Sequence, residues 1–262
     1  MLLAIDCGNT HVVFGIFNHS NLLHSWRAQT SDTSDKERFL SSFNEQLVNI
    51  GLTLSDITDV IIASVVIEAT NCFNYLENSI AIPFRSITSP STILPIDIDL
   101  PEPSEVGADR VVNAVAGSLL TQSDFIIVDF GTATTFDVVE MIDDRAVYKG
   151  GIIAPGVNLS VEALSKAASK LPDINLNVRP ALVKAIGKNT QDAMWSGIIW
   201  GYAGLIEGII QKIRSESKSD FEIIATGGLA SLYLPYCDLI SNQEPNLTLL
   251  GLHQIAKING YK

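Results

Sequence analysis

The chain contains the same short pattern twice, and this repeat constrains the fold more than any other feature of the sequence. Residues 2–10 (LLAIDCGNT) and residues 125–133 (FIIVDFGTA) each consist of an apolar run, an aspartate, one further residue, a glycine and a small polar residue. The two aspartates lie 129 − 6 = 123 residues apart, close to half of the 262-residue chain. A second apolar stretch follows each copy, at residues 12–17 and 135–139. Internal similarity at this spacing predicts two α/β domains, each opening with a hairpin whose turn carries Asp and Gly, facing each other across a cleft.

The turn of each copy is suited to binding phosphate. Glycine gives the backbone conformational freedom, and successive N–H groups in such a turn form a concave site for phosphate oxygens. The neighbouring aspartate is suited to hold the cation that accompanies a nucleoside triphosphate. A single unit of this kind is more often an ordinary turn. Two such turns that converge on one phosphate chain make a more specific hypothesis.

Composition and charge limit the possible functions. With 47% hydrophobic and 18% charged residues, the chain has ample material for packed cores, which argues against disorder. A formal charge of −12 and a pI near 4.6 argue against a broad basic face for nucleic acid. An anionic substrate would therefore need locally placed Arg, Lys, N–H groups or metal ions.

The spacing of cysteines and histidines gives no sign of a metal site or a disulfide framework. The three cysteines are scattered, and the four histidines lack metal-ligand spacing. No signal peptide is evident, and the most apolar helical stretch, residues 193–206, is short for a membrane span. We therefore expect a protein of the reduced cytoplasm that contacts no membrane.

In the first half of the chain, periodicity and composition predict two helices, a buried strand and an extended segment. Apolar residues four positions apart indicate the first helix, a continuous β-branched run indicates a buried parallel strand, and five prolines indicate extended connections at a domain edge. The helices are expected over residues 35–50 and 71–79, the strand over 59–66 and the extended segment over 83–103. We place the N-terminal domain at residues 1–118 and the C-terminal domain at residues 119–262.

Two charged residues, Asp109 and Arg110, stand where an apolar, Ala-rich helix is expected to begin. Asp109 could simply cap that helix, which is a common role for aspartate. Arg110 is harder to explain in this way, because a guanidinium near a helix N-terminus opposes the helix dipole. An anionic ligand would account for the cation there. From the residues alone, both interpretations remain open.

The second half contains glycines in three places that need an explanation. Residues 149–156 (KGGIIAPG) lead to a helix expected over 158–169, whose free N–H groups are suited to bind an anion. A further helix is expected from a sequence resembling a capping box, residues 189–192, to about residue 215, and four glycines recur along one side of it. Because each interior glycine weakens a helix, the four predict a close helix contact, across a subunit interface or inside the fold. The pair at residues 227–228 lets a flat base or a ribose lie against backbone.

Taken in order, these motifs resemble those of the type III pantothenate kinases, the bacterial Baf-like family, over nearly the whole chain. The similarity consists of DCGNT at 6–10, GADR at 107–110, DFGTAT at 129–134, the glycines of 150–156, Asn189–Thr190 and TGG at 226–228. The resemblance implies the fold of the actin, Hsp70 and sugar kinase superfamily, with two ribonuclease-H-like domains around a nucleotide cleft. It also implies phosphorylation of pantothenate by ATP, the first step towards coenzyme A, in a homodimer that needs Mg²⁺ and a monovalent cation, K⁺ or NH₄⁺.

The same resemblance assigns roles to individual residues. ATP would be held by Thr132 and by the first turn, namely Asp6, Cys7, Gly8, Asn9, Thr10, His11, Val12 and Val13, with Asp6 also suited to Mg²⁺. Pantothenate would be held by Gly107, Ala108, Asp109 and Arg110, and Thr190 would reach the pantothenate of the partner subunit. Asp129 would bind the monovalent cation. Family members usually have Tyr at the position of Leu100 and Asn at that of Glu102, so we expect this substrate-binding loop to hold pantothenate more weakly.

The chemistry of the reaction fits these assignments. In-line attack of a primary alcohol on the γ-phosphoryl group mainly requires positioning and charge neutralisation. Asp109 would orient the hydroxyl and accept its proton as general base, and Arg110 would pair with the pantothenate carboxylate. One alternative is a related kinase for another small alcohol, suggested by Leu100. Another is a non-catalytic regulator or nucleic-acid binder on the same fold, against which the charge of −12 argues.

Overall fold

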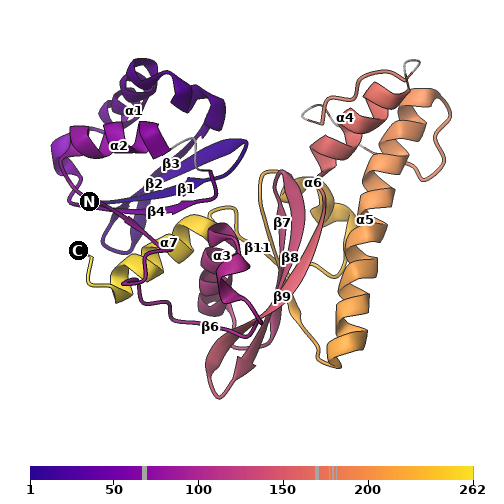
Figure 1. Ribbon diagram of the computed structural model, residues 1–262. Coiled ribbons are helices and arrows are strands. Elements are labelled where there is room, and N and C mark those ends of the chain that lie inside the picture. Colours follow the sequence, from indigo (N-terminus) through magenta and orange to yellow (C-terminus); the bar gives the residue numbers. More distant parts are fainter. Residues whose placement is uncertain (67–69, 169–170, 177, 179, 181, 262) are drawn as a thin grey trace. The chain divides into compact units, whose positions relative to one another are not determined.

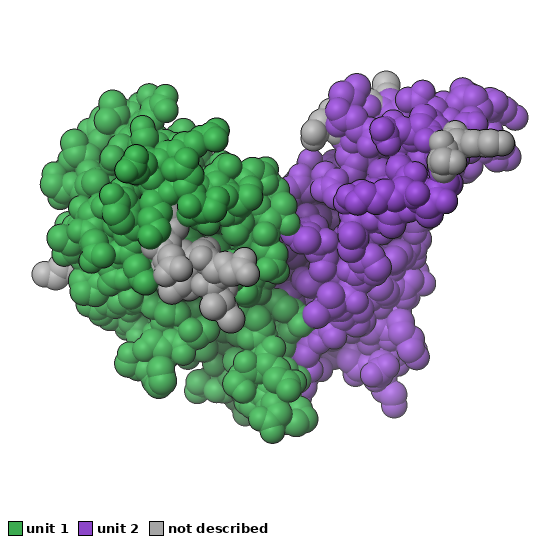
Figure 2. Space-filling view, turned by 45° about the horizontal axis from the view of Figure 1, so that its top comes forward, with its two compact units in different colours: residues 1–120, 142–148, 246–262 green, residues 121–141, 149–245 purple. Residues whose placement is uncertain are grey.

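The computed structural model describes residues 1–66, 70–168, 171–176, 178, 180 and 182–261 (Figure 1), and the side chains of residues 70–72, Cys72 among them, lie outside the description. The chain divides into two compact units (Figure 2), each described by itself below. Unit 1 comprises residues 1–120, 142–148 and 246–262, and unit 2 comprises residues 121–141 and 149–245. The predicted division between residues 118 and 119 lies near the first of these breaks, and the domain boundaries themselves stay a prediction.

Unit 1 is built on a five-stranded sheet in the order β3-β2-β1-β4-β5. Its strands are β1 (Leu2–Cys7), β2 (His11–Asn18), β3 (Asn21–Gln29), β4 (Asp59–Ser64) and β5 (Phe84–Ser86). The first three strands form an antiparallel meander, whereas β4 runs parallel to β1 and β5 runs parallel to β4. Short turns suffice for the meander, and the parallel strands follow helical crossovers.

Helices cover both faces of this sheet (Figure 1). They are α1 (Lys36–Asn49) and α2 (Thr70–Ile80) on one face, and α3 (Ala108–Leu120) and α7 (Leu247–Ile258) on the other, with short 3-10 turns η1 (Thr30–Ser34), η2 (Leu54–Asp56) and η3 (Pro103–Glu105). The helices predicted over 35–50 and 71–79 are confirmed as α1 and α2. In α1, Phe39, Phe43 and Leu47 are buried, as their spacing predicted, and the Asp35 carboxylate caps the helix by accepting from the Arg38 N–H at 3.1 Å.

The second sheet has six strands in the order β11-β10-β7-β8-β9-β6. They are β6 (Asp97–Ile98), β7 (Phe125–Phe130), β8 (Ala133–Ile142), β9 (Arg145–Pro155), β10 (Glu222–Thr226) and β11 (Asn242–Gln243). The helices of unit 2 are α4 (Val157–Ala167), α5 (Thr190–Ser217) and α6 (Ala230–Tyr233), followed by η4 (Leu234–Tyr236). The helix predicted over 158–169 is α4, and its last predicted residue lies outside the described residues.

The two sheets share one topology, which confirms the repeat seen in the sequence. Strands β1 to β5 correspond to β7, β8, β9, β10 and β11, and in both sheets the first strand of the repeat lies between an antiparallel and a parallel neighbour. Asp6 and Asp129 are each the fifth residue of their strand, half-buried after four buried residues. The chain therefore has two ribonuclease-H-like halves. The convergence of their two turns on one triphosphate stays a prediction.

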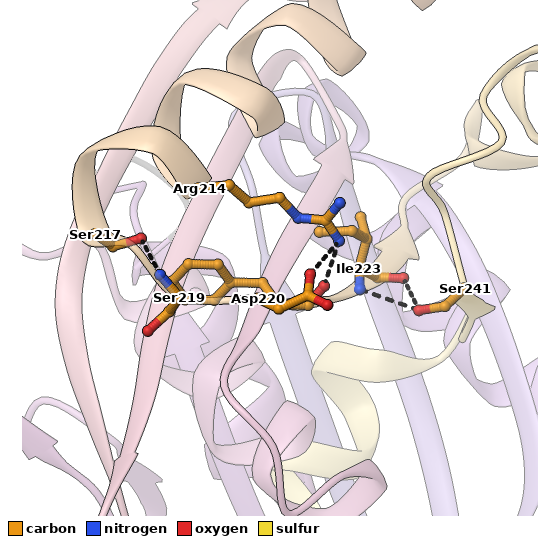
Figure 3. Close-up of polar contacts among 7 residues, drawn as sticks. Arg214, Ser217, Ser219, Asp220, Ile223 and Ser241 are labelled. Atoms are coloured by element: carbon orange, nitrogen blue, oxygen red, sulfur yellow. Dashed lines mark hydrogen bonds and ion pairs between the residues drawn. The ribbon is translucent and has the colours of Figure 1, made fainter.

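The long helix α5 is joined to β10 by a turn that polar contacts hold in place (Figure 3). Arg214 Nη2 donates to the Phe221 carbonyl at 2.8 Å and forms an ion pair with Asp220 at 3.1 Å. Ser241 Oγ accepts from the Ile223 N–H and donates to the Ile223 carbonyl, both at 3.0 Å. These contacts fix where β10 begins, and therefore where its last residues lie beside β7.

Helix α5 is the one described helix that is long and apolar enough to cross a membrane by length and composition. This is weak support for a membrane span, because the core helix of a soluble protein passes the same test. One side of α5 is buried in the core of unit 2, where Ile199, Ile206 and Ile210 are fully enclosed.

Candidate active site

The first predicted phosphate turn joins β1 to β2. The Gly8 N–H donates to the His11 carbonyl at 2.9 Å and closes the turn, while the side chains of Asn9 and Thr10 are exposed. Buried Thr30 fastens the turn from the end of β3, because its hydroxyl donates to the Gly8 carbonyl at 2.7 Å and its N–H donates to the Thr10 carbonyl at 2.9 Å. The backbone of the turn is therefore held in one conformation, as a preformed phosphate site requires.

Two members of the predicted ATP-binding set have side chains in the core. Cys7 is 1% exposed and Val12 is 0% exposed, so these residues can meet a ligand only through their backbone. Burial raises the pKa of the Cys7 thiol to about 11, so the thiol stays protonated at neutral pH and takes no part in chemistry. Among its neighbours in the turn, His11 and Val13 are half-buried.

His11 is held neutral at the edge of the same turn. Burial, with a smaller contribution from Arg27, lowers the pKa of its imidazole below the usual range. Its Nε2 lies 3.1 Å from the side-chain nitrogen of Gln29, from which a neutral ring accepts a hydrogen bond. The turn thus carries no cationic side chain of its own, and its attraction for phosphate rests on N–H groups.

In the second turn, Asp129 lies against closely packed glycine backbone. A Cβ added to Gly227, whose φ is +89°, would lie 2.5 Å from Asp129 Oδ1 and 2.6 Å from the Phe130 nitrogen. A Cβ added to Gly131 would lie 3.6 Å from the same carboxylate oxygen, and Gly156, at the start of α4, packs directly on the Thr132 carbonyl. Close approach of backbone to Asp129 and to the turn therefore explains at least two of the glycines that the sequence singled out.

Asp109 and Arg110 stand in the first turn of α3. Asp109 is the second residue of the helix rather than its cap, and its Oδ1 accepts from the Arg110 N–H at 2.9 Å. A Cβ on Gly107 would lie 2.6 Å from that oxygen, so glycine is needed where the carboxylate folds back over the helix start. The half-buried carboxylate is fixed by backbone at an end of the helix that favours negative charge.

Arg110 extends over the aromatic ring of Tyr148. The guanidinium carbon lies 5.9 Å from the ring centroid, and Tyr148 is 0% exposed. Sequence reasoning missed both Tyr148 and Thr30. The sequence offers no local signal for either residue, since apolar Val147 separates Ala146 from Tyr148 and the alternation of their burial along β9 appears only in the structure.

The remaining predicted substrate residues lie at the ends of elements. Leu100 is half-buried in the segment after β6, where the Asp99 N–H donates to the Tyr148 carbonyl at 3.0 Å. Thr190 is exposed at the first position of α5. The side-chain oxygen of Asn189 caps that helix by accepting from the Asp192 N–H at 2.8 Å. Its side-chain nitrogen donates to the Asp192 carboxylate at 3.0 Å. The second hydrogen bond of this capping box therefore joins two side chains, where the usual capping box has a side chain accepting from backbone.

The glycine stripe of α5 faces outward. It consists of Gly197, Gly201, Gly204 and Gly208, and none of them has a described atom within 4 Å of an added Cβ apart from the helix's own backbone and chain neighbours. The prediction of internal packing is therefore wrong for the described chain. Trp200, 42% exposed, lies between the first two of these glycines.

No group of three or more His, Cys, Asp or Glu side chains is placed to hold a metal ion within the residues that the structure describes. A divalent ion that accompanies a nucleoside triphosphate is bound by one or two carboxylates together with the phosphates, so a single protein carboxylate such as Asp6 fits that need. The first turn, the start of α3 and Tyr148 all belong to unit 1. Within unit 2 the structure brings together Asp129 and its glycines with Thr132.

Comparisons with known proteins give a consistent result. A sequence model of the type III pantothenate kinases matches residues 2–212. Proteins of that name from Paramagnetospirillum magneticum and Geobacillus kaustophilus are 44% and 41% identical to this chain, over alignments that cover 99% and 100% of it and 98% and 99% of the relatives.

Solved structures agree in fold. A Baf family protein from Campylobacter jejuni matches with a TM-score of 0.55 at 18% identity, covering 98% of this chain and 97% of that one. The ROK hexokinase from Thermus thermophilus matches with a TM-score of 0.50 at 12% identity, covering 98% of each chain. At these identities the solved structures bear on the fold alone.

Proposed function

The chain belongs to the type III pantothenate kinase family, and from this premise we propose how its residues share the work of the reaction. The enzyme transfers the γ-phosphoryl group of ATP to pantothenate, in coenzyme A biosynthesis, and uses a divalent metal ion. The observation that carries the proposal is the placement of Asp109, a half-buried carboxylate fixed at the start of a helix whose Val112, Ala114 and Val115 are fully buried.

Pantothenate is held by the start of α3. Asp109 orients the primary hydroxyl and accepts its proton as the oxygen attacks the γ-phosphorus. Arg110 pairs with the pantothenate carboxylate, which explains a cation at a helix N-terminus. The Gly107 backbone lets the Asp109 carboxylate fold over the helix start, so the base is positioned before substrate binds.

The ATP phosphates bind to the first turn. The N–H groups of the turn around exposed Asn9 and Thr10 can donate to the phosphate oxygens, and Thr30 fixes that turn, which supports its role as a preformed site. Asp6 holds Mg²⁺, which when bound neutralises the charge on the β- and γ-phosphates. In the second turn, exposed Thr132 contacts the nucleotide.

Asp129 binds the monovalent cation, K⁺ or NH₄⁺. Its half-buried carboxylate, with the backbone of Gly131 and Gly227 packed close to it, offers an oxygen ligand of the kind that such a cation prefers. The backbone of Gly227 and Gly131 lies so close to the Asp129 carboxylate that side chains at these two positions would crowd it. These observations support the assignment, which a titration with KCl tests directly.

A homodimer uses the outward face of α5. Four glycines with open space above them let a second helix approach closely, and exposed Trp200 adds apolar surface to the same helix. Thr190, exposed at the start of α5, then reaches the pantothenate of the partner subunit. The free, buried thiols of Cys7 and Cys237 agree with a cytoplasmic enzyme.

The experiment measures 4′-phosphopantothenate formed by the purified protein from ATP, MgCl₂, KCl and pantothenate. Asp109→Asn should lower kcat by at least about a hundredfold, the usual contribution of a general base, without changing the thermal midpoint. Glu37→Gln is the matched control, because Glu37 is likewise the second residue of its helix, α1. If Asp109→Asn keeps more than about a tenth of the wild-type rate, Asp109 is not the base.

A related kinase for another small alcohol remains the second candidate, because Leu100 stands where the family usually has Tyr and is half-buried near the site. A panel of primary alcohols separates the two, since pantothenate should be the only strong acceptor. A regulator that binds nucleic acid would instead show salt-dependent DNA binding, which the charge of −12 opposes.

A further inference from the structure

Tyr148 lies where three segments of unit 1 meet. It stands opposite Ile98 in the parallel pairing of β9 with β6, and its carbonyl accepts from the Asp99 N–H at 3.0 Å. Arg145, three residues before Tyr148 in β9, forms an ion pair with Asp97 of β6 at 2.7 Å, which joins the same two strands. The backbone of Tyr148 therefore anchors the chain at Asp99. From there the chain continues through the loop that carries Leu100 and Glu102 to the start of α3.

The side chain of Tyr148 supports the first turn of α3. Its ring is fully buried, so it cannot swing away, and the Arg110 guanidinium carbon lies 5.9 Å from its centroid. This distance is within the range in which an aromatic ring attracts a guanidinium. Arginine carries large rotamer entropy, so a guanidinium held against a ring loses less freedom when it binds a carboxylate.

We propose that Tyr148 is a positioning residue of the pantothenate site, which holds the Arg110 guanidinium ready for the substrate carboxylate and anchors the loop beside it. This inference rests on the proposed pairing of Arg110 with that carboxylate. Tyr148 acts through Arg110, so its effect should appear in the KM for a substrate that carries the carboxylate. It should not appear in kcat or in the KM for ATP.

The test compares two substitutions on two substrates. Tyr148→Met removes the ring but keeps an adaptable apolar side chain, whereas Tyr148→Phe keeps the ring and removes the hydroxyl. The substrates are pantothenate and pantothenyl alcohol, in which a hydroxymethyl group replaces the carboxylate. Tyr148→Met should raise the KM for pantothenate about fivefold, from loss of an aromatic–cation contact, and leave the KM for the alcohol within about twofold. Because Tyr148→Phe keeps the ring beside Arg110, it should raise the KM for pantothenate less than Tyr148→Met does.

A series of fluorinated phenylalanines at position 148 covers the case in which the methionine variant does not fold. Fluorine withdraws charge from the ring face while the shape stays nearly the same, so the KM for pantothenate should rise with each added fluorine. A flat series, or an equal rise for pantothenate and pantothenyl alcohol, overturns the proposal.

Arg110→Gln separates the failure of this inference from the failure of the proposed function. If Arg110→Gln raises the KM for pantothenate but not for the alcohol, and the Tyr148 variants do not, Arg110 binds the carboxylate without help from Tyr148. If Arg110→Gln leaves both KM values unchanged, the carboxylate assignment itself is wrong, and the inference is overturned with it. In support of the proposal, Tyr148→Met should add nothing in the Arg110→Gln background, because coupled residues are not additive.

Discussion

Replacing Gly251 by alanine should destabilise unit 1 and weaken pantothenate binding, although Gly251 lies on the C-terminal helix. In α7, a Cβ added to Gly251 would lie 2.7 Å from Val112 Cγ1 and 3.0 Å from the Val112 carbonyl carbon, and closer still to the carbonyl oxygen. The obstacle is α3 backbone, so the two helices must move apart. Val112 is less than one helical turn from Asp109, so the displacement reaches the base.

The magnitude follows from two opposing effects. Overpacking a tight contact costs about 1–3 kcal/mol, and contact with backbone places this case near the upper end. Alanine gains about 1 kcal/mol over glycine in a helix interior. The net loss should be about 2 kcal/mol of unfolding free energy. The hydrogen bond of 2.8 Å from Thr248 to Asn113, which joins the same two helices, would also lose its geometry.

Urea unfolding followed by circular dichroism measures the stability, and the KM for pantothenate measures the displacement of α3. Ser41→Ala is the control, because Ser41 is exposed inside α1 and lies outside the glycine stripe of α5 that the proposed dimer uses. That substitution should change the unfolding free energy by no more than about 0.5 kcal/mol. If Gly251→Ala is as stable as the wild type, or if the two variants shift stability equally in one direction, the packing of α7 on α3 does not position the site.

Four further outcomes are expected. Gly227→Ala should push the Asp129 carboxylate aside and raise the KCl concentration for half-maximal activity at least about tenfold, as removal of supporting contacts at ion sites does. Asp129→Asn should abolish the response to K⁺, and a variant with an unchanged KCl titration would contradict the cation assignment. Gly201→Leu should convert a dimer into monomers of 28.3 kDa by light scattering, and an unaltered dimer would place the interface elsewhere. Burial lowers the pKa of His253 below 6.5, so as the pH falls the imidazole is protonated in the unfolded state before it is protonated in the folded state. The free energy of unfolding should therefore fall as the pH drops below about 6.5. His253→Gln should make that fall less steep, and an equal dependence on pH in the variant and the wild type would refute the role of His253.

The sequence was sufficient for the features that depend on neighbouring residues. The repeat of apolar run, aspartate and glycine predicted both hairpins, because strand alternation and turn chemistry are local properties. The spacing of Phe39, Phe43 and Leu47 predicted α1 for the same reason. The first turn and the start of α3 were recognised as candidate ligand sites because Gly, Asp and Arg there carry their chemistry in the residue type itself.

Contacts between residues far apart in the chain were decided by the tertiary structure alone. The sequence left open whether the glycines of α5 pack inside the fold, and only the structure turns them outward. It gave no sign that Gly251 lies against Val112 or that Tyr148 lies under Arg110, since each pair joins separate elements. Such pairs form only when whole helices and strands have packed, because the positions of their side chains are set by the sheet register and the helix contacts rather than by any local pattern.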